Sequence, residues 1–458
     1  MSDLIVPDGM PNPFLVPFPD VGINFVEVNF VNPIENAYYG ERIAYLVNDP
    51  QQLFTPINYQ GKPTVLFVDL SSDPGNSPLY VAGTPPFAVV NASPVPITIG
   101  DASTTYQDII SGTGGLTLDL AAPTGQLALG GGNNAVYEQT APTNFGPVQP
   151  EAWYYYLAGG NNFIGAYMGN DTINSVGGNN LIALGSGNDL VYSDGTDTVW
   201  AGTGNDTVYV GNSVLIAGNT GALNFVGGSG AATIFAGSGN SSIDGGNASV
   251  TVFGGQSSGD IVGGALGNNL LVGGFAAETL QGGGYGDSIF GGTAPSVLLA
   301  GPGNETLAGS AAGTNTYIRG GPNGTDLLVA GGGAVTLVGG GPINTDVMFT
   351  GPGANTVIGG QSWDFIEGSS GTTYVKAGSG TEVFGFAQGF AGGQMTIQGF
   401  NPALDSIMLQ LYPAGTATNV VQHEQPVSGG VMLTLPDNTH ITLLGLSNLP
   451  ASNVIQTA

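Results

Sequence analysis

Short apolar runs of three or four residues recur along the middle of the chain, and a glycine-rich turn precedes each run. The polar residues just before successive runs are separated by nine, nine, nine, eight and nine positions: Asn162, Asp171, Asn180, Asp189, Asp197 and Asp206. A period of nine that combines a turn with a short strand is typical of a coil that winds into stacked parallel sheets. Two such units make one coil of about eighteen residues, so each strand buries its apolar face against its neighbours in the stack.

The same pattern divides the chain into three regions. Residues 1–78 are rich in proline and aromatic residues and lack the glycine rhythm, so they are candidates for a cap, an anchor or an assembly segment. Residues 79–394 carry the glycine-punctuated repeats, and residues 395–458 contain longer alternating runs that are typical of β-hairpins. We therefore predict an all-β fold, a right-handed parallel β-roll or β-solenoid with an N-terminal β-rich region and a C-terminal β cap.

The composition favours many tight turns joined by short strands. The 458 residues include 80 glycines without the every-third period of collagen, and the hydrophobic content of 41% is too high for a disordered chain. The absence of cysteine excludes disulfides and thiol chemistry. The first twenty residues lack a basic segment and a continuous apolar segment, so we predict no Sec signal peptide. No apolar window is long enough to cross a bilayer, so we predict that the chain is not transmembrane.

The charge is strongly acidic, because 32 Asp and Glu residues face only four bases and give a net charge of −28. This balance argues against a nucleic-acid partner, which needs Lys and Arg to displace counterions from phosphates. It also argues against electrostatic docking on an anionic membrane. Such an excess of carboxylates repels itself unless it is spread along an elongated body or neutralised by cations.

The acids recur at the spacing of one full coil, which would stack them on neighbouring turns. The first set with this spacing is Asp171, Asp189 and Asp206, and the later sets are Asp260 with Glu278, Asn269 with Asp287 and Glu305, and Asp346 with Asp364 and Glu382. The opposite edge carries Asn162, Asn180 and Asp197, and later Asn355 and Thr373, which favours a neutral hydrogen-bonded ladder. Acids stacked about 5 Å apart repel each other, whereas a bound hard cation such as Ca²⁺ makes their electrostatic energy favourable. We expect about three calcium patches separated by metal-free turns, although Asp and Asn are also good turn residues without any metal.

Two stretches, LGSGNDLVY (184–192) and AGTGNDTVY (201–209), match the form G-G-x-G-x-D-x-U-x at every position except the first. AYMGNDTIN around Asp171 is weaker, because Tyr167 replaces the second glycine, and GSGAATIFA (228–236) has lost the aspartate. The form and spacing resemble the calcium-binding β-roll of RTX (repeats-in-toxin) proteins. The resemblance implies Ca²⁺ held by acids and turn carbonyls, and the candidate ligands are Asp171, Asp189, Asp197, Asp206, Gly187, Gly204, Asp260, Glu278, Asp287, Glu305, Asp346, Asp364 and Glu382.

The resemblance also implies a secreted protein of a Gram-negative bacterium. Proteins of this family leave through a type I secretion channel with an uncleaved C-terminal signal, and the tail ITLLGLSNLPASNVIQTA fits that position. We expect a calcium-binding structural protein of the cell surface or extracellular matrix, of S-layer-like type, that assembles with itself. An adhesin or carbohydrate-binding module with a cell-surface polysaccharide as partner is the alternative, and an ice-binding protein is a weaker one.

Catalysis has little support in the sequence, so we expect no enzyme. The bases are few and scattered, no G-x-S-x-G motif is present, and His423 and His440 lie in expected C-terminal strands without a neighbouring acid cluster. A polysaccharide-active β-helix enzyme would need paired carboxylates in a cleft. Trp153 with Tyr154–Tyr156, Trp200 and Trp363 could form a sugar-stacking surface, although such residues are more often part of a β-core or an end cap.

Overall fold

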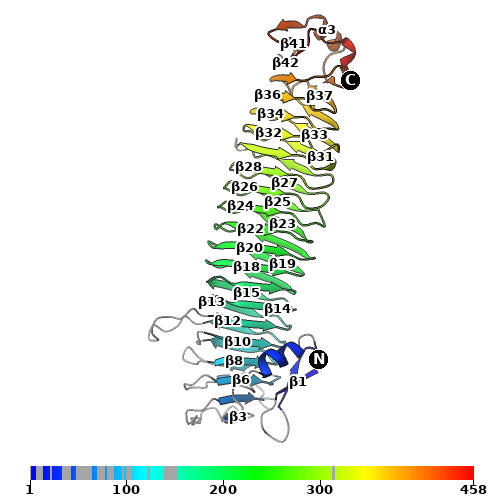
Figure 1. The fold of residues 1–458 in the computed structure, drawn as a ribbon. Coiled ribbons are helices and arrows are strands. Elements are labelled where there is room, and N and C mark those ends of the chain that lie inside the picture. The colour runs from blue at the N-terminus through cyan, green and yellow to red at the C-terminus, as the bar shows by residue number, and fades with distance from the viewer. Residues whose placement is uncertain are drawn as a thin grey trace. The chain divides into compact units, whose positions relative to one another are not determined.

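A computed structural model of the protein describes residues 2–6, 14–20, 23–32, 43–47, 64–69, 78–79, 87–94, 97–99, 106–120, 124–138, 152–311 and 315–457. Tertiary contacts divide the chain into two compact units, Met1–Ala232 and Thr233–Ala458. In each unit, short strands alternate along the chain between two parallel sheets, here named sheet 1 and sheet 2 (Figure 1). The β-solenoid and the nearly all-β fold predicted from the repeat are therefore confirmed.

In the first unit, sheet 1 contains β3 (Ile43–Val47), β4 (Thr64–Val68), β6 (Phe87–Asn91), β8 (Tyr106–Ser111), β10 (Thr124–Leu129), β12 (Ala152–Leu157), β14 (Thr172–Ser175), β16 (Leu190–Ser193), β18 (Asn205–Val210) and β20 (Ala222–Gly227). Its sheet 2 contains β5 (Pro78–Leu79), β7 (Ile97–Ile99), β9 (Leu116–Leu120), β11 (Ala135–Glu138), β13 (Phe163–Met168), β15 (Leu181–Ser186), β17 (Thr196–Trp200) and β19 (Ser213–Ala217). The junction of the two units lies within β21 (Ala231–Phe235).

In the second unit, sheet 1 contains β22 (Ser241–Asp244), β24 (Gly259–Val262), β26 (Glu278–Gln281), β28 (Ser296–Leu299), β30 (Thr316–Arg319), β32 (Val335–Val338), β34 (Ala354–Ile358), β36 (Thr372–Lys376), β38 (Gln394–Gln398), β40 (Gln425–Val427), β41 (Gly430–Thr434) and β42 (His440–Leu444). Its sheet 2 contains β23 (Ser249–Phe253), β25 (Leu270–Val272), β27 (Ser288–Phe290), β29 (Thr306–Ala308), β31 (Asn323–Val329), β33 (Ile343–Phe349), β35 (Trp363–Glu367), β37 (Thr381–Ala387), β39 (Ser406–Gln410) and β43 (Val454–Thr457).

The core of each unit is a pair of apolar columns between the two sheets. Each strand contributes one central side chain, and the parallel register places it on its counterpart in the next coil, as Ile173 lies on Val191 and Val191 on Val208. These side chains have no exposed surface. Burial of one Val, Leu or Ile side chain contributes about 1.5–3 kcal/mol, so a strand of four residues is stable only as part of the stack.

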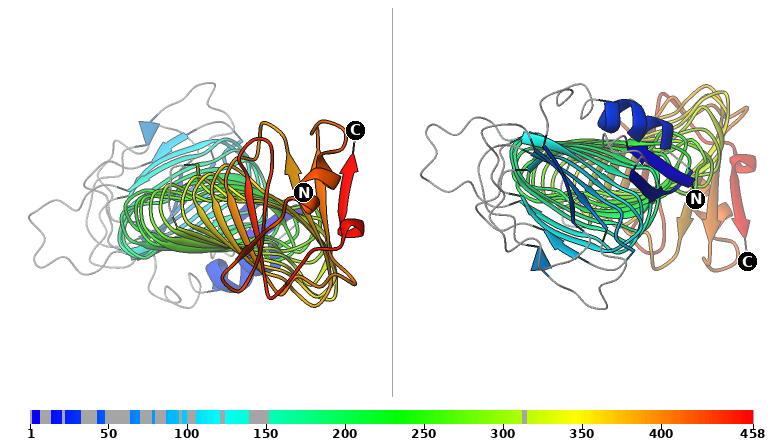
Figure 2. Two further views of the ribbon diagram at one scale, coloured as in Figure 1. Left: turned by 90° about the horizontal axis from the view of Figure 1, so that it is seen from above. Right: turned by 90° about the horizontal axis from the view of Figure 1, so that it is seen from below.

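The N-terminal segment covers one side of the first unit. β1 (Ser2–Val6) pairs antiparallel with β2 (Phe14–Phe18), and α1 (Ile23–Val26) continues as the π-helical turn η1 (Glu27–Val31). Phe18 and Phe30 are fully buried in one cluster with Val90, Ala128 and other outward-facing residues of sheet 1. The helix lies against the flank of the coils (Figure 1; Figure 2, right). β3 and β4 lie N-terminal to the glycine-rich region that begins near residue 79, yet β3 already pairs parallel with β4, and β4 pairs parallel with β6.

The C-terminal region combines further coils with a small cap. β38 and β39 continue the two sheets, and β41 forms an antiparallel hairpin with β42, which itself pairs parallel with β38. α3 (Thr416–Gln422) and the 3-10 turn η3 (Ala451–Asn453) lie between the last strands, and β43 pairs parallel with β39. His423 directly follows α3 and is exposed, so its expected place in a strand is wrong, whereas His440 begins β42 as expected.

Candidate calcium-binding ladders

Three aspartates of the first unit stack on one edge of sheet 1. The register places Asp171, Asp189 and Asp206 at the start of successive strands, and each side chain is at most 2% exposed. The backbone N–H of Asp171 donates to Oδ1 of Asp189 at 2.8 Å, and the N–H of Asp189 donates to Oδ1 of Asp206 at 3.3 Å. The ladder predicted from the spacing of eighteen and seventeen residues is thus present.

The opposite edge of the first unit carries the neutral ladder that the sequence predicted. The amide of Asn162 donates to Oδ1 of Asn180 at 2.6 Å, and the amide of Asn180 donates to Oδ1 of Asp197 at 2.8 Å. The hydroxyl of Ser193 donates to the second oxygen of Asp197 at 2.7 Å. Asp197 therefore has hydrogen-bond donors on both oxygens and ends an amide ladder, which makes it a weaker metal ligand than the aspartates of sheet 1.

Glycine is required where the turns that precede Asp189 and Asp206 stack on one another. Gly187 has φ +151°. A Cβ atom at Gly187 would overlap the carbonyl oxygen of Gly169, and one at Gly204 would overlap the carbonyl oxygen of Gly187. The carbonyls of these turns are therefore directed at the next coil, beside the stacked aspartates. This is the arrangement in which turn carbonyls add to the oxygen ligands that carboxylates offer to Ca²⁺.

The second unit contains a longer acidic ladder along sheet 2. Its members occupy equivalent positions on successive coils: Asn269, Asp287, Glu305, Asp326, Asp346, Asp364, Glu382 and Asp405. The backbone N–H of Glu305 donates to Oδ1 of Asp326 at 3.0 Å, and that of Glu382 donates to Oδ1 of Asp405 at 3.0 Å. The two patches expected around Glu305 and Asp364 are therefore one continuous ladder.

Asp326 and Asp405 were missed by the sequence analysis. They follow Glu305 and Glu382 by 21 and 23 residues, because the intervening coils are longer than the regular eighteen. Both could have been found from another pattern in the sequence: each is an acid that ends a glycine-containing turn directly before an apolar strand, whatever the length of the coil. Asn344 adds to the same ladder, since its amide donates to Oδ2 of Asp326 at 3.0 Å and to Oδ1 of Asp346 at 2.7 Å.

One of the predicted pairs is wrong. The register places Gly259, not Asp260, opposite Glu278, because the strands are offset by nineteen residues at this coil. Asp260 consequently points outward and is exposed. Glu278 is buried between Gly259 and Ser296, and its Oε2 accepts the backbone N–H of Gly274 at 2.5 Å. It has no acidic neighbour at the equivalent position of either adjacent coil.

Most ladder acids also close their own turn. One oxygen of Asp206, Glu305, Asp326 and Asp364 accepts the N–H of a turn glycine at 2.8, 2.7, 2.7 and 2.5 Å, respectively. This hydrogen bond stabilises the turn and needs no metal. It does not account for Oδ2 of Asp189, Oε1 of Glu305 and Oδ1 of Asp364, which are buried and accept no hydrogen bond. A buried carboxylate oxygen without a donor is costly unless a cation satisfies it.

Burial raises the pKa values of several ladder acids. The pKa of Asp189 rises to about 7, mainly through desolvation and also through the charge of Asp206. Desolvation likewise raises the pKa of Glu305 to about 8 and that of Asp346 to about 7, and the charges of neighbouring ladder acids add to both shifts. The pKa of Glu382 rises to about 8 through burial and through Asp405. At neutral pH these sites therefore hold protons that a divalent cation would displace.

Ca²⁺ fits these ladders only if backbone carbonyls take part. Within the described ranges, no three Asp, Glu or His side chains converge tightly enough to hold an ion by themselves. Ca²⁺ takes six to eight oxygens and accepts backbone carbonyls readily. The unsatisfied oxygens of Asp189, Glu305 and Asp364, each in its own coil, and the carbonyls of the adjacent glycine turns would supply such ligands.

Most of the aromatic group around Trp153 is buried and offers no sugar-stacking surface. Trp153, Tyr155 and Tyr156 are at most 3% exposed and belong to the packed region of the first unit. Tyr155 donates its hydroxyl to Oε1 of the buried Glu138 at 2.5 Å. Trp200 and Trp363 are 50% and 40% exposed, and they belong to different units.

The fold and site define a class of protein: a parallel β-solenoid with buried acidic ladders along its glycine turns. The profile of the RTX calcium-binding nonapeptide repeat matches residues 165–195, 191–213, 226–259, 272–294, 281–312 and 344–375. The chain thus carries RTX calcium-binding nonapeptide repeats, and these repeats and the solenoid fit an RTX β-roll protein. No curated protein matches the sequence. None of the helices in the described parts of the chain is both long and apolar enough to cross a bilayer.

Proposed function

We propose that this chain is a secreted, non-catalytic structural protein of the bacterial cell surface or extracellular matrix that folds when it binds calcium. The observation that carries the proposal is the set of buried carboxylate oxygens without hydrogen-bond donors at Asp189, Glu305 and Asp364. Without metal, these carboxyl groups are either protonated or ionised and repelling each other. The metal-free coils are therefore weakly stable at neutral pH. Calcium outside the cell supplies the missing interaction and makes folding depend on compartment.

Self-assembly is the second part of the proposal, and the outer face of sheet 2 in the second unit supports it. Phe290 and Phe349 point outward and are 39% and 40% exposed, and Val272 and Val329 lie directly beside them on neighbouring strands. Water-exposed apolar sheet faces favour association with another molecule. We propose that a second copy covers this face in a filament or a lattice of S-layer-like type.

The N-terminal segment is a less suitable assembly element. Phe18 and Phe30 are buried against the chain's own coils, so docking on a neighbour would require exchange of this segment between subunits.

Export in an unfolded state fits the position of the C-terminal tail. β42 and β43 are built into sheets 1 and 2, so the tail is available to a secretion channel only before the coils form. We propose type I secretion with an uncleaved C-terminal signal, followed by folding in external calcium. Low calcium inside the cell then delays folding until export is complete.

A calcium titration of the full chain, started in EGTA and followed by circular dichroism and sedimentation, tests both parts. The proposal expects strand signal and particle mass to rise together, and the variant Phe290→Ser/Phe349→Ser to gain strand signal while remaining monomeric. Replacement of the exposed Tyr192 by Ser in the first unit is the matched surface control. A strand signal that is independent of calcium contradicts calcium-driven folding, and a monomer at saturating calcium contradicts assembly alone.

A further inference from the structure

Two strands of sheet 1 in the second unit present the same pair of outward side chains. β30 has the sequence Thr-Tyr-Ile-Arg, and the last four residues of β36 are Thr-Tyr-Val-Lys. In both, the first and third of these residues are buried, whereas the tyrosine and the cation are exposed. Tyr317 with Arg319, and Tyr374 with Lys376, therefore form two equivalent pairs on one face.

The register fixes the distance between the pairs. Tyr317 lies beside Thr336, Thr336 beside Thr356, and Thr356 beside Tyr374, so the two tyrosines are three strand steps apart. Arg319 and Lys376 are separated by the same three steps in the adjacent column. At about 4.8 Å per step, each separation is about 14 Å. Two threonine hydroxyls thus lie in line between two aromatic rings.

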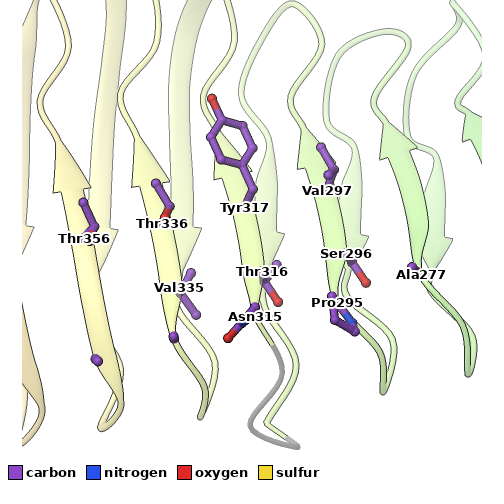
Figure 3. A pocket seen from close by; sticks show the side chains of 12 residues that line it. Ala277, Pro295, Ser296, Val297, Asn315, Thr316, Tyr317, Val335, Thr336 and Thr356 are labelled. Atoms are coloured by element: carbon purple, nitrogen blue, oxygen red, sulfur yellow. The ribbon is translucent and has the colours of Figure 1, made fainter.

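A shallow groove follows this face from β26 to β34, around Tyr317, and ends before β36. It has a volume of about 560 Å³ and is lined by Val297, Tyr317, Thr336 and Thr356 together with the beginnings of their strands. Figure 3 shows these four side chains on the same side of the sheet, with the ring of Tyr317 standing highest. A second hollow of about 320 Å³ lies beside Arg319, between Leu299 and Pro342.

The charge on this face is opposite to that of the protein as a whole. The chain has four bases and a net charge of −28, and Arg319 and Lys376 are the two bases within the described residues. The outward positions of β28 to β38 carry Ala, Thr, Tyr, Val, Leu, Ile, Gln, Arg and Lys, but no carboxylate. This is a cationic island, aligned with exposed aromatic rings, on an otherwise acidic chain.

We propose that this face binds an extended acidic polysaccharide, one that carries carboxylate or sulfate groups. Tyr317 and Tyr374 offer faces on which sugar rings stack, and Thr336 and Thr356 offer hydroxyls to the sugar between them. Arg319 binds an anionic group through its planar fork, and Lys376 binds a second one as a point charge. The spacing of about 14 Å requires a chain of several sugars, so a monosaccharide engages only one pair. The site lies on the outer face, apart from the buried acid ladder, and goes beyond the proposed structural function.

Calorimetry of the full chain in millimolar calcium tests this site, with a chondroitin sulfate octasaccharide as probe and a neutral dextran oligosaccharide of equal length as control. The wild type is expected to bind the acidic probe, with an affinity that falls as salt rises, and to bind the neutral probe far more weakly. Arg319→Gln and Lys376→Gln are each expected to weaken binding about tenfold, which is typical for loss of one charge-assisted contact. Tyr317→Ser and Tyr374→Ser should also weaken binding, whereas Tyr192→Ser in the first unit should not.

All these side chains are exposed, so the variants keep the fold, which circular dichroism verifies. Equal binding of the acidic and neutral probes, or unchanged binding by Arg319→Gln/Lys376→Gln, overturns the proposal. The double variant also distinguishes a second copy as the occupant. If it lowers the particle mass in sedimentation and leaves probe binding unchanged, the island serves self-association through an acidic surface, and the polysaccharide proposal is wrong.

Discussion

Replacement of Asp189 by Asn should stabilise the calcium-free fold and reduce the stabilisation that calcium adds. Burial, and to a lesser degree the charge of Asp206, raises the pKa of Asp189 from 3.8 to about 7. The folded state therefore binds the proton more tightly than the unfolded state does. Below pH 4 the side chain is protonated in both states and does not change the free energy of unfolding. As the pH rises from 4 to 7, the metal-free fold loses stability. Above pH 7 the ionised carboxylate keeps the full penalty.

The size of this penalty follows from the same pKa. A rise from 3.8 to about 7 corresponds to about 4 kcal/mol, and solvent screening reduces this to about 2–4 kcal/mol. An asparagine retains the acceptor for the N–H of Asp171 and adds a donor, as Asn180 does in the neutral ladder of the opposite edge. In EGTA at pH 8, Asp189→Asn should therefore raise the free energy of unfolding by about 2–4 kcal/mol.

The assay is urea unfolding followed by circular dichroism at pH 4 and pH 8, in EGTA and in calcium. The gain from Asp189→Asn should vanish at pH 4, and calcium should stabilise the variant less than the wild type. Asp194→Asn is the matched control, because Asp194 lies in the same unit and is exposed. A lower stability of Asp189→Asn in EGTA at pH 8, or equal stabilisation of both proteins by calcium, would refute the reasoning.

Three further predictions follow from the geometry. Calcium binding near pH 7 should acidify a weakly buffered solution, because the pKa values of Glu305 and Glu382 are about 8, and a titration without proton release would contradict this. Gly204→Ala should lower the free energy of unfolding in calcium by about 2–4 kcal/mol, because the added Cβ overlaps the carbonyl oxygen of Gly187. Gly159→Ala should change it little, because the nearest atom to the added Cβ is 3.7 Å away. Equal effects of the two variants in denaturant unfolding would count against the stacked turns. Phe30→Ala should lower the free energy of unfolding by about 3–5 kcal/mol and promote aggregation, because it uncovers the outer face of sheet 1. Val28→Ala, at a position that is 60% exposed, should do neither. Thermal unfolding and light scattering measure the two effects.

The sequence was sufficient wherever the coils keep their regular length. The spacing of Asp171, Asp189 and Asp206 predicted their stacking, and the asparagines opposite them predicted the amide ladder, because parallel register follows directly from equal coil lengths. The prediction failed at Asp260, where an offset of nineteen residues places glycine in the inward position and turns the acid outward. A shift of one residue in a strand reverses which side chains face the core.

The sequence was insufficient where contacts are non-local or the coils are irregular. Asp326 and Asp405 lie in coils of 21 and 23 residues, so a fixed period does not find them, although each ends a turn directly before a strand. The packing of Phe30 and Phe18 on the flank of the first unit depends on outward apolar residues of sheet 1 that carry no periodic signal. The paired Tyr317–Arg319 and Tyr374–Lys376 became visible only when the register placed them on one face.

The most direct test of the central claim is the number of calcium ions bound per chain, measured by equilibrium dialysis with radioactive calcium. Wild-type protein should be compared with a variant in which Asp189→Asn, Glu305→Gln and Asp364→Asn remove the three unsatisfied carboxylate oxygens. We expect the wild type to bind several ions and the variant, with its fold verified by circular dichroism, to lose those held at these three positions. Equal binding by the two proteins would show that the buried ladders are turn structures and that any calcium binds elsewhere.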